Sequence, residues 1–156
     1  MHRGKEESPA SKWIKSPIGI YFLSLLVANV LSSVGYTMSL KWAHDGTIRV
    51  GPFCTAQAII KQLGNLSSAL WAIVIALHVF ITIFWEKKSA RFVAPIVAAV
   101  IWVLVFFIVI VIGLLGSTND KRGPWWGVEP FWCGITENYR VEAFVVDYLP
   151  VRIAFP

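Results

Sequence analysis

Three long stretches of the chain contain no charged residue, at 16–40, 62–85 and 92–118. A helix rises ~1.5 Å per residue and the hydrocarbon core of a bilayer is ~30 Å thick, so ~20 mostly apolar residues are enough to cross it. These runs are too long and too uniformly apolar for the strands of a membrane barrel. Because a spanning backbone must satisfy its own hydrogen bonds, the pattern predicts an all-α fold, a transmembrane helical bundle with three membrane-spanning helices.

The ends of the predicted helices follow from capping residues and from the charged loops between the apolar runs. The first helix is expected from 17 to about 40, because Ser16 and Pro17 suit the N-cap and the first turn. The second is expected from about 52 to 85 and the third from 92 to about 115. The second helix is longer than a bilayer requires, so it must tilt or project beyond the membrane.

The same pattern divides the chain into three parts. They are a cytoplasmic tail at 1–15, a three-helix membrane domain at 16–118, and an outer loop with an incomplete C-terminal segment at 119–156. The first apolar run is too long for the core of a signal peptide, so we expect an uncleaved helix. No fourth span is predicted, because Asp147, Pro150 and Arg152 interrupt the last apolar stretch.

Basic residues set the expected orientation, because loops rich in Lys and Arg stay in the cytoplasm. The N-terminal tail and the second loop carry Arg3, Lys5, Lys12, Lys15, Lys87, Lys88 and Arg91. The opposite side carries slightly fewer, namely Lys41, Arg49, Lys61, Lys121, Arg122 and Arg140. This modest bias predicts that the N-terminus lies in the cytoplasm.

The two cysteines, Cys54 and Cys133, are an independent test of that orientation. Three crossings place the first and third loops on the same side of the membrane, so both cysteines face outside. An oxidising compartment permits a disulfide there, which would tie the start of the second helix to the third loop. The alternative is two free thiols. A zinc site is not expected, because no suitable cluster of His or Cys accompanies the pair.

Composition supports a membrane protein and excludes most soluble classes. Hydrophobic residues make up 56% of the chain, charged residues only 15%, and the mean hydropathy is +0.64. The net charge of +5 is expected to serve topology and contact with lipid headgroups, so no nucleic-acid partner is predicted. The chain has no phosphate-binding glycine loop and no pair of acids or Ser/His/Asp set that could share one site. We therefore expect neither an enzyme nor a cofactor.

The second predicted helix carries a stripe of polar and aromatic side chains. Its members recur every three or four residues, along one supercoiled face, and are Cys54, Gln57, Lys61, Asn65, Ser68, Trp71, Ile75, His78 and Thr82. The stripe either faces a cavity that holds a ligand or ion, or joins the helices by hydrogen bonds. The two alternatives are equally weighted for Gln57, Lys61 and Asn65, whereas helix joining is favoured for Ser68 and Thr82.

Two further polar side chains are predicted inside the membrane. His78 fits an interhelical hydrogen bond better than a proton relay. Asn29 shares a face of the first helix with Ser33 and Tyr36, and it too would either line a cavity or bond to a neighbouring helix.

Several strings of the sequence resemble one family of membrane receptors. They are Val50-Gly51-Pro52-Phe53-Cys54-Thr55-Ala56-Gln57, Lys61-Gln62-Leu63-Gly64-Asn65, Ala69-Leu70-Trp71, Ile75-Ala76-Leu77-His78-Val79-Phe80, Tyr21-Phe22-Leu23-Ser24-Leu25-Leu26, Phe131-Trp132-Cys133 and Asp147-Tyr148-Leu149. Together they are similar to fungal seven-transmembrane G-protein-coupled receptors of the glucose-sensing and cAMP-receptor-like kind. The resemblance covers roughly residues 16–149, and the Gly-Pro-Phe-Cys-Thr-Ala-Gln string is its most specific part.

The resemblance has consequences for architecture. It implies that the three predicted helices correspond to the second, third and fourth helices of a partial seven-helix receptor, and that Cys54 and Cys133 form a disulfide. The chain departs from the family at Asn29, where Asp is common, and at Gly134, where a second Trp is expected. The first, sixth and seventh helices are not found. The resemblance therefore implies a truncated or divergent receptor.

The function implied by the resemblance is signalling from the plasma membrane. The receptor would sense an extracellular small molecule, such as a sugar or another nutrient, and signal to a heterotrimeric G protein. The ligand-binding candidates are Gln57, Lys61, Gln62 and Asn65. The alternatives are a small oligomeric transporter or channel subunit, whose pathway the polar stripe would line, and a structural membrane protein.

Overall fold

The fold is all-α apart from one small sheet. In this computed structural model, residues 13–85, 92–117, 123–145 and 149 are described. Within them, three helical segments are long and apolar enough to cross a membrane. They are Pro17–Asp45, Pro52–Phe84 and Val93–Gly116, with mean hydropathies of 1.9, 2.2 and 3.3. The prediction of a helical bundle with three membrane-spanning helices is confirmed.

The first span begins at the residue that its capping signal predicts. Helix α2 (Pro17–Thr37) has Ser16 as its N-cap, and the Ser16 hydroxyl accepts a hydrogen bond of 3.1 Å from the Gly19 amide. Proline takes the first helical position, where no amide donor is needed. The tail at 1–12 and the second loop at 86–91 lie outside the described residues.

The predicted end of this span at residue 40 is wrong. After Met38 the chain continues as helix α3 (Ser39–Asp45) and ends at Gly46, whose φ of +65° suits a residue without Cβ. The additional helical turns place Trp42 against the second span, where its ring is buried. Tertiary packing therefore extends the helix beyond the point at which the apolar pattern stops.

The other two spans agree with their predicted positions. Helix α4 (Pro52–Trp85) is continuous and begins at a proline. The third span consists of α5 (Val93–Phe106), a π-helical segment η1 (Phe107–Ile112) and α6 (Gly113–Ser117), which follow one another without a break.

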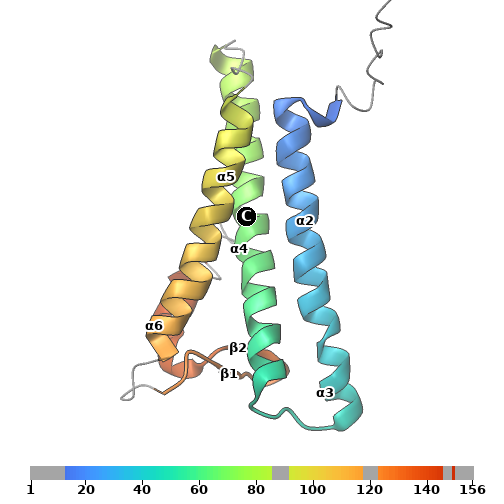
Figure 1. The fold of residues 1–156 in the computed structure, drawn as a ribbon, viewed down its shortest axis with the longest axis vertical. Coiled ribbons are helices and arrows are strands. Elements are labelled where there is room, and N and C mark those ends of the chain that lie inside the picture. The colour runs from blue at the N-terminus through green and yellow to red at the C-terminus, as the bar shows by residue number, and fades with distance from the viewer. Residues whose placement is uncertain (1–12, 86–91, 118–122, 146–148, 150–156) are drawn as a thin grey trace, which may run out of the picture.

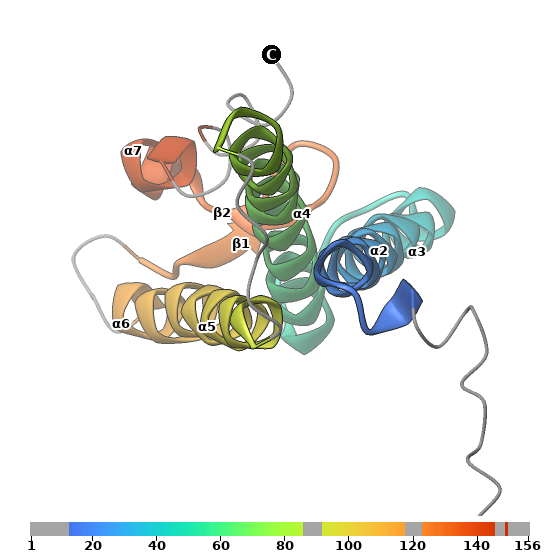
Figure 2. The ribbon, with the colours of Figure 1, turned by 90° about the horizontal axis from the view of Figure 1, so that it is seen from above.

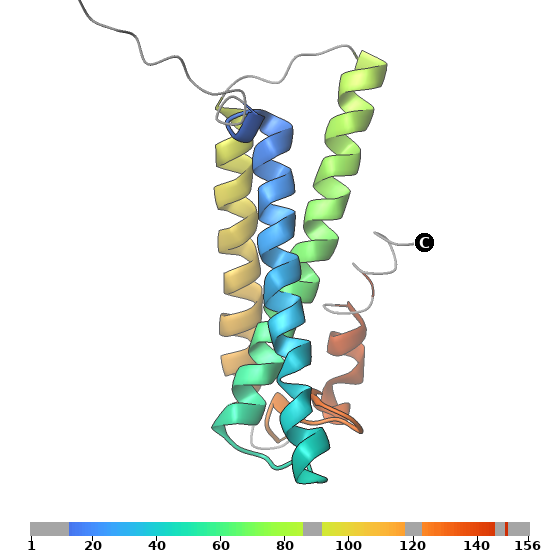
Figure 3. The same cartoon turned by 90° about the vertical axis from the view of Figure 1, so that its right-hand side faces the viewer.

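The three spans pack against one another, so that α2 contacts both α4 and α5, and α4 also contacts the third span. Helix α2 packs along one side of α4, and α5 packs along another (Figures 1 and 2). Toward its C-terminal end, α4 leans away from α2 and α5 (Figure 3). The side chains of α4 accordingly change from buried to exposed along the helix: Trp71 is fully buried, whereas Ile83 and Phe84 are two-thirds exposed.

The apolar core is divided along the length of the bundle. One cluster joins α2, α4 and α5 around Tyr21, Ala28, Trp71 and Ala94, and a second joins α4 to the third span. Large apolar side chains also cover the outward face of α5, where Val103 is 69% exposed. An apolar face of this kind matches the expected contact with lipid.

A third apolar cluster lies at the end of the bundle where α3 ends and α4 begins. We call this end of the bundle the hairpin end. There the strands β1 (Trp126–Val128) and β2 (Cys133–Ile135) form an antiparallel pair, in which Val128 lies opposite Cys133. A short 3-10 turn η2 (Glu137–Tyr139) and helix α7 (Arg140–Ala143) follow. Figure 1 shows this hairpin across the end of α4.

Candidate functional site

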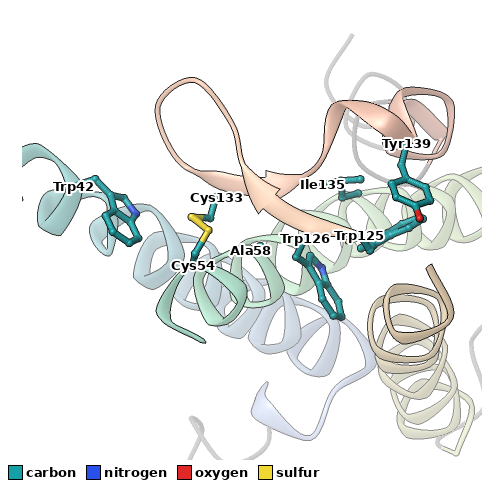
Figure 4. Packing of buried hydrophobic residues seen from close by; sticks show 8 residues of the cluster. All are labelled: Trp42, Cys54, Ala58, Trp125, Trp126, Cys133, Ile135 and Tyr139. Atoms are coloured by element: carbon teal, nitrogen blue, oxygen red, sulfur yellow. A yellow bond between two sulfur atoms is a disulfide. The ribbon is translucent and has the colours of Figure 1, made fainter. Parts of the chain in front are cut away.

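The hairpin is fixed to α4 by the disulfide between Cys54 and Cys133 (Figure 4). The two Cα atoms are 5.3 Å apart, and both side chains are buried. The Glu129 amide donates to the Trp132 carbonyl at 2.8 Å and closes the turn between the strands. The predicted pairing of the two cysteines is confirmed, and the alternative of free thiols is wrong.

Two consecutive tryptophans fix the hairpin to the third span. The ring of Trp126 lies so close to Gly113 that a Cβ there would overlap it, and Trp125 lies in the same way against Gly116. Trp125 also packs against the ring of Tyr139, with centroids 4.7 Å apart. The hairpin therefore bridges α4 and the third span through covalent and close-packed contacts.

A pocket of about 200 Å³ lies between α4, the hairpin and α7. Residues of α4 form one wall, and residues of the hairpin, η2 and α7 form the others. Among the described residues, its charged lining consists of Lys61, Glu129, Glu137 and Arg140. A wider hollow of about 860 Å³ on the α3 side of the hairpin shares the two glutamates, but no Lys or Arg lines it among the described residues.

Lys61 is the most buried charge of this pocket, with only 7% of the residue exposed. Its Nζ lies 4.2 Å from the ring centroid of Trp132 and 4.8 Å from that of Tyr36. Aromatic faces attract a cation and so offset part of the cost of its burial. The ammonium group is thereby held between a hairpin residue and a residue of α2, at the boundary of the pocket.

The acidic residues of the pocket are electrostatically coupled to the basic ones. Burial raises the pKa of Glu129 above its ordinary value, and the nearby Glu137 carboxylate raises it further. Lys61 and Arg140 oppose this shift in the pKa of Glu129. Arg140 also forms an exposed ion pair with Glu137, with 3.2 Å between Nη2 and Oε1. All four charged side chains therefore lie close enough to interact electrostatically around Glu129.

Of the predicted ligand-binding residues, Lys61 and Gln62 line the pocket and Gln57 does not. Gln57 is fully buried between α4 and the first span. Its Oε1 accepts a bond of 2.6 Å from the Trp42 indole, and its amide donates to Gly35 O and Ser39 Oγ at 3.2 and 2.8 Å. These contacts match the helix-joining alternative.

Asn65 and Asn29 also join helices. The Ser32 hydroxyl donates to Asn65 Oδ1 at 2.6 Å, and the Asn65 amide donates to the Tyr36 hydroxyl at 3.3 Å. Asn29 Oδ1 accepts a hydrogen bond of 3.1 Å from Ser68 Oγ. The predicted polar stripe is therefore divided in the structure. Most of its hydrogen-bonding members connect α4 to the first span, whereas Lys61, its one charged member, lines the pocket.

His78 lies near the opposite end of α4. Its ring packs edge-on against Tyr21 of α2, with centroids 5.4 Å apart. Thr82 donates to the His78 carbonyl at 2.8 Å, within the same helix. His78 is therefore remote from the pocket, and its neighbour is an aromatic ring.

Sequence analysis missed the half of the pocket that the hairpin and α7 supply. Glu129 and Glu137 each stand four residues from Cys133, and Lys61 stands about two helical turns from Cys54. Once the cysteines are paired, these charges must lie near one another. The signal was therefore present in the spacing around the cysteines, but only the structure shows that Trp132 and Arg140 complete the pocket.

The pocket has the composition of a binding site for a small polar molecule. It combines donors, acceptors and one aromatic ring at one end of the bundle. Among the described residues, no group of three or more His, Cys, Asp or Glu side chains could hold a metal ion. Comparisons of the chain with protein families, with curated proteins and with solved structures found no match.

Proposed function

We propose that this chain is a ligand-sensing membrane receptor, in which a small polar molecule binds the pocket at the hairpin end. The observation that carries the proposal is the position of the pocket, whose walls belong to α4 and to a hairpin fixed to α4 by the disulfide. A ligand there contacts elements that are also packed against the third span. Binding can therefore favour one arrangement of the helices over another.

The disulfide supports placing this end outside the cell. Disulfides persist in oxidising compartments and are rare in the cytosol. The hairpin end would then meet extracellular ligands, and the opposite ends of the helices would face the cytoplasm. In this proposal the chain lies in the plasma membrane, and a heterotrimeric G protein at the cytoplasmic ends receives the signal.

Binding in nanodiscs tests the first part of the proposal. The probes are a set of neutral hexoses and a set of small amino acids, each at millimolar concentration. We expect saturable binding of at least one set, lost in Lys61→Met. Lys41→Met is the matched control, because Lys41 also lies over aromatic rings at the hairpin end but outside the pocket. Absence of saturable binding by both sets would overturn the proposal.

Coupling to a G protein is tested by reconstituting the chain with one. The bound probe should accelerate exchange of GDP for GTP, and Lys61→Met should remove the acceleration. Flux of the probe across sealed vesicles would favour the transporter alternative instead. An unchanged exchange rate at saturating probe would refute signalling by this chain.

A further inference from the structure

The α4 wall of the pocket offers hydrogen-bond donors. Lys61 supplies an ammonium group, and the neighbouring Gln62 supplies a side-chain amide, although only 3% of Gln62 is exposed. Gln62 Oε1 already accepts a hydrogen bond of 3.3 Å from the Trp126 indole. The NH2 end of that amide is thus the end that remains for a ligand. An ammonium and an amide together suit a carboxylate, which only accepts hydrogen bonds.

The opposite walls offer carboxylates. Glu129 lies at the turn of the hairpin and Glu137 begins the 3-10 turn that follows it. The two carboxylates raise each other's electrostatic energy, as the effect of Glu137 on the pKa of Glu129 indicates. A ligand ammonium near the two carboxylates would relieve that repulsion and would donate charge-assisted hydrogen bonds to them.

The charged residues that line the pocket in the described part of the chain are equal in number for each sign. Lys61 and Arg140 carry two positive charges, and Glu129 and Glu137 carry two negative charges. Because Glu137 and Arg140 are largely exposed and already pair with each other, a ligand would interact most strongly with Lys61 and Glu129, where burial strengthens the attraction between opposite charges. A molecule with one charge of each sign preserves the balance and meets a partner at each end.

We propose that the pocket binds a small zwitterion, a molecule with one carboxylate and one ammonium group. The carboxylate lies toward Lys61 and Gln62 on α4, and the ammonium lies toward Glu129 of the hairpin. A volume of about 200 Å³ suits a molecule of amino-acid size. This inference rests on the proposed function, because it names the class of ligand for the same pocket.

The experiment uses ligands that differ by one charged group. 4-Aminobutyrate carries both charges, butyrate only the carboxylate and butylamine only the ammonium, and D-glucose is the neutral probe. Binding to the full chain in nanodiscs is measured by isothermal titration. We expect 4-aminobutyrate to bind at least about tenfold more tightly than each single-charge ligand, which is the loss expected for one charge-assisted hydrogen bond.

Two variants assign each charge of the ligand to its partner. In Lys61→Met, 4-aminobutyrate should bind no more tightly than butylamine, and in Glu129→Gln no more tightly than butyrate. Lys41→Met should bind 4-aminobutyrate like the parent chain. Quantitative formation of the Cys54–Cys133 disulfide in each variant shows that the hairpin is still in place.

The outcomes separate this inference from the proposed function. Binding of D-glucose that requires Lys61, without binding of 4-aminobutyrate, would overturn the zwitterion and leave a ligand-binding receptor. Butyrate binding as tightly as 4-aminobutyrate would also overturn it, because Glu129 would then have no role. Absence of binding by hexoses and amino acids alike would overturn both.

Discussion

Replacement of Gln57 by Leu tests whether the polar stripe of α4 holds the bundle together. Leucine has a similar size but cannot hydrogen-bond, so the change removes the bonds to Trp42, Gly35 and Ser39 together. The bonds to Trp42 and Gly35 are buried, and an unsatisfied buried group costs ~1–3 kcal/mol. If each bond contributed only the ~0.6 kcal/mol typical of membrane helices, the three together would still contribute about 2 kcal/mol.

The expected loss in the free energy of unfolding is therefore about 2–3 kcal/mol. It is measured by reversible unfolding of the chain in bicelles. Trp42→Phe removes the indole donor and keeps an aromatic ring, so it separates one bond from the others. In the double variant we expect the two losses to be non-additive by about 1 kcal/mol, because the Trp42–Gln57 bond is counted in both single variants.

Thr82→Val is the control for this experiment. The Thr82 hydroxyl donates only to the His78 carbonyl of its own helix, and that bond is exposed. Its removal should change the free energy of unfolding by less than about 0.5 kcal/mol. A loss below about 1 kcal/mol for Gln57→Leu, or additive losses in the double variant, would refute a joining role for Gln57.

Three further predictions concern the hairpin end and the contact between α2 and α4. Paired replacement of Cys54 and Cys133 by Ser should destabilise the hairpin by up to about 4 kcal/mol, since the cross-link spans 79 residues, and should expose the third loop to limited proteolysis. Gly64→Ala should cost about 1–3 kcal/mol in bicelle unfolding, because its Cβ would lie 2.6 Å from Ser32 Cα; Gly51→Ala, with open space around it, should cost far less. The pKa of Glu129 is raised in the folded chain, so the stability that this carboxyl contributes is present at low pH and is lost as pH rises through the folded pKa. Hydrogen exchange of the hairpin amides should show that slope, and Glu129→Gln should abolish it.

Much of the membrane domain could be predicted from the sequence, because lipid imposes a simple rule. A span must be apolar, helical and of sufficient length, and α4 satisfies each condition within the predicted bounds. The end of the first span could not be predicted in this way. Residues 41–45 include Lys41, His44 and Asp45 and look like a loop, yet they stay helical because Trp42 finds a partner on α4.

The pocket was harder to predict, because half of it comes from a loop. The 3.5-residue repeat placed Lys61 and Gln57 on one stripe of α4, but it could not show that Gln57 is used by α2 while Lys61 faces the hairpin. That distinction depends on how α4 is rotated about its own axis, because the first span and the hairpin contact different sides of it. The contribution of Glu129 depends on the hairpin register, and short strands between Gly and Pro residues carry little signal of their own.

The glycine contacts of the two hairpin tryptophans have a consequence for biogenesis. Trp126 occupies the space beside Gly113, and Trp125 the space beside Gly116, so their docking surface is complete only after the third span has been inserted beside α4. Oxidation of Cys133 with Cys54 should then be a late event in maturation. Pulse-labelled chains trapped with an alkylating agent should retain both thiols until the third span leaves the translocon, so the redox state of the Cys54–Cys133 pair would report whether the third span has packed against α4.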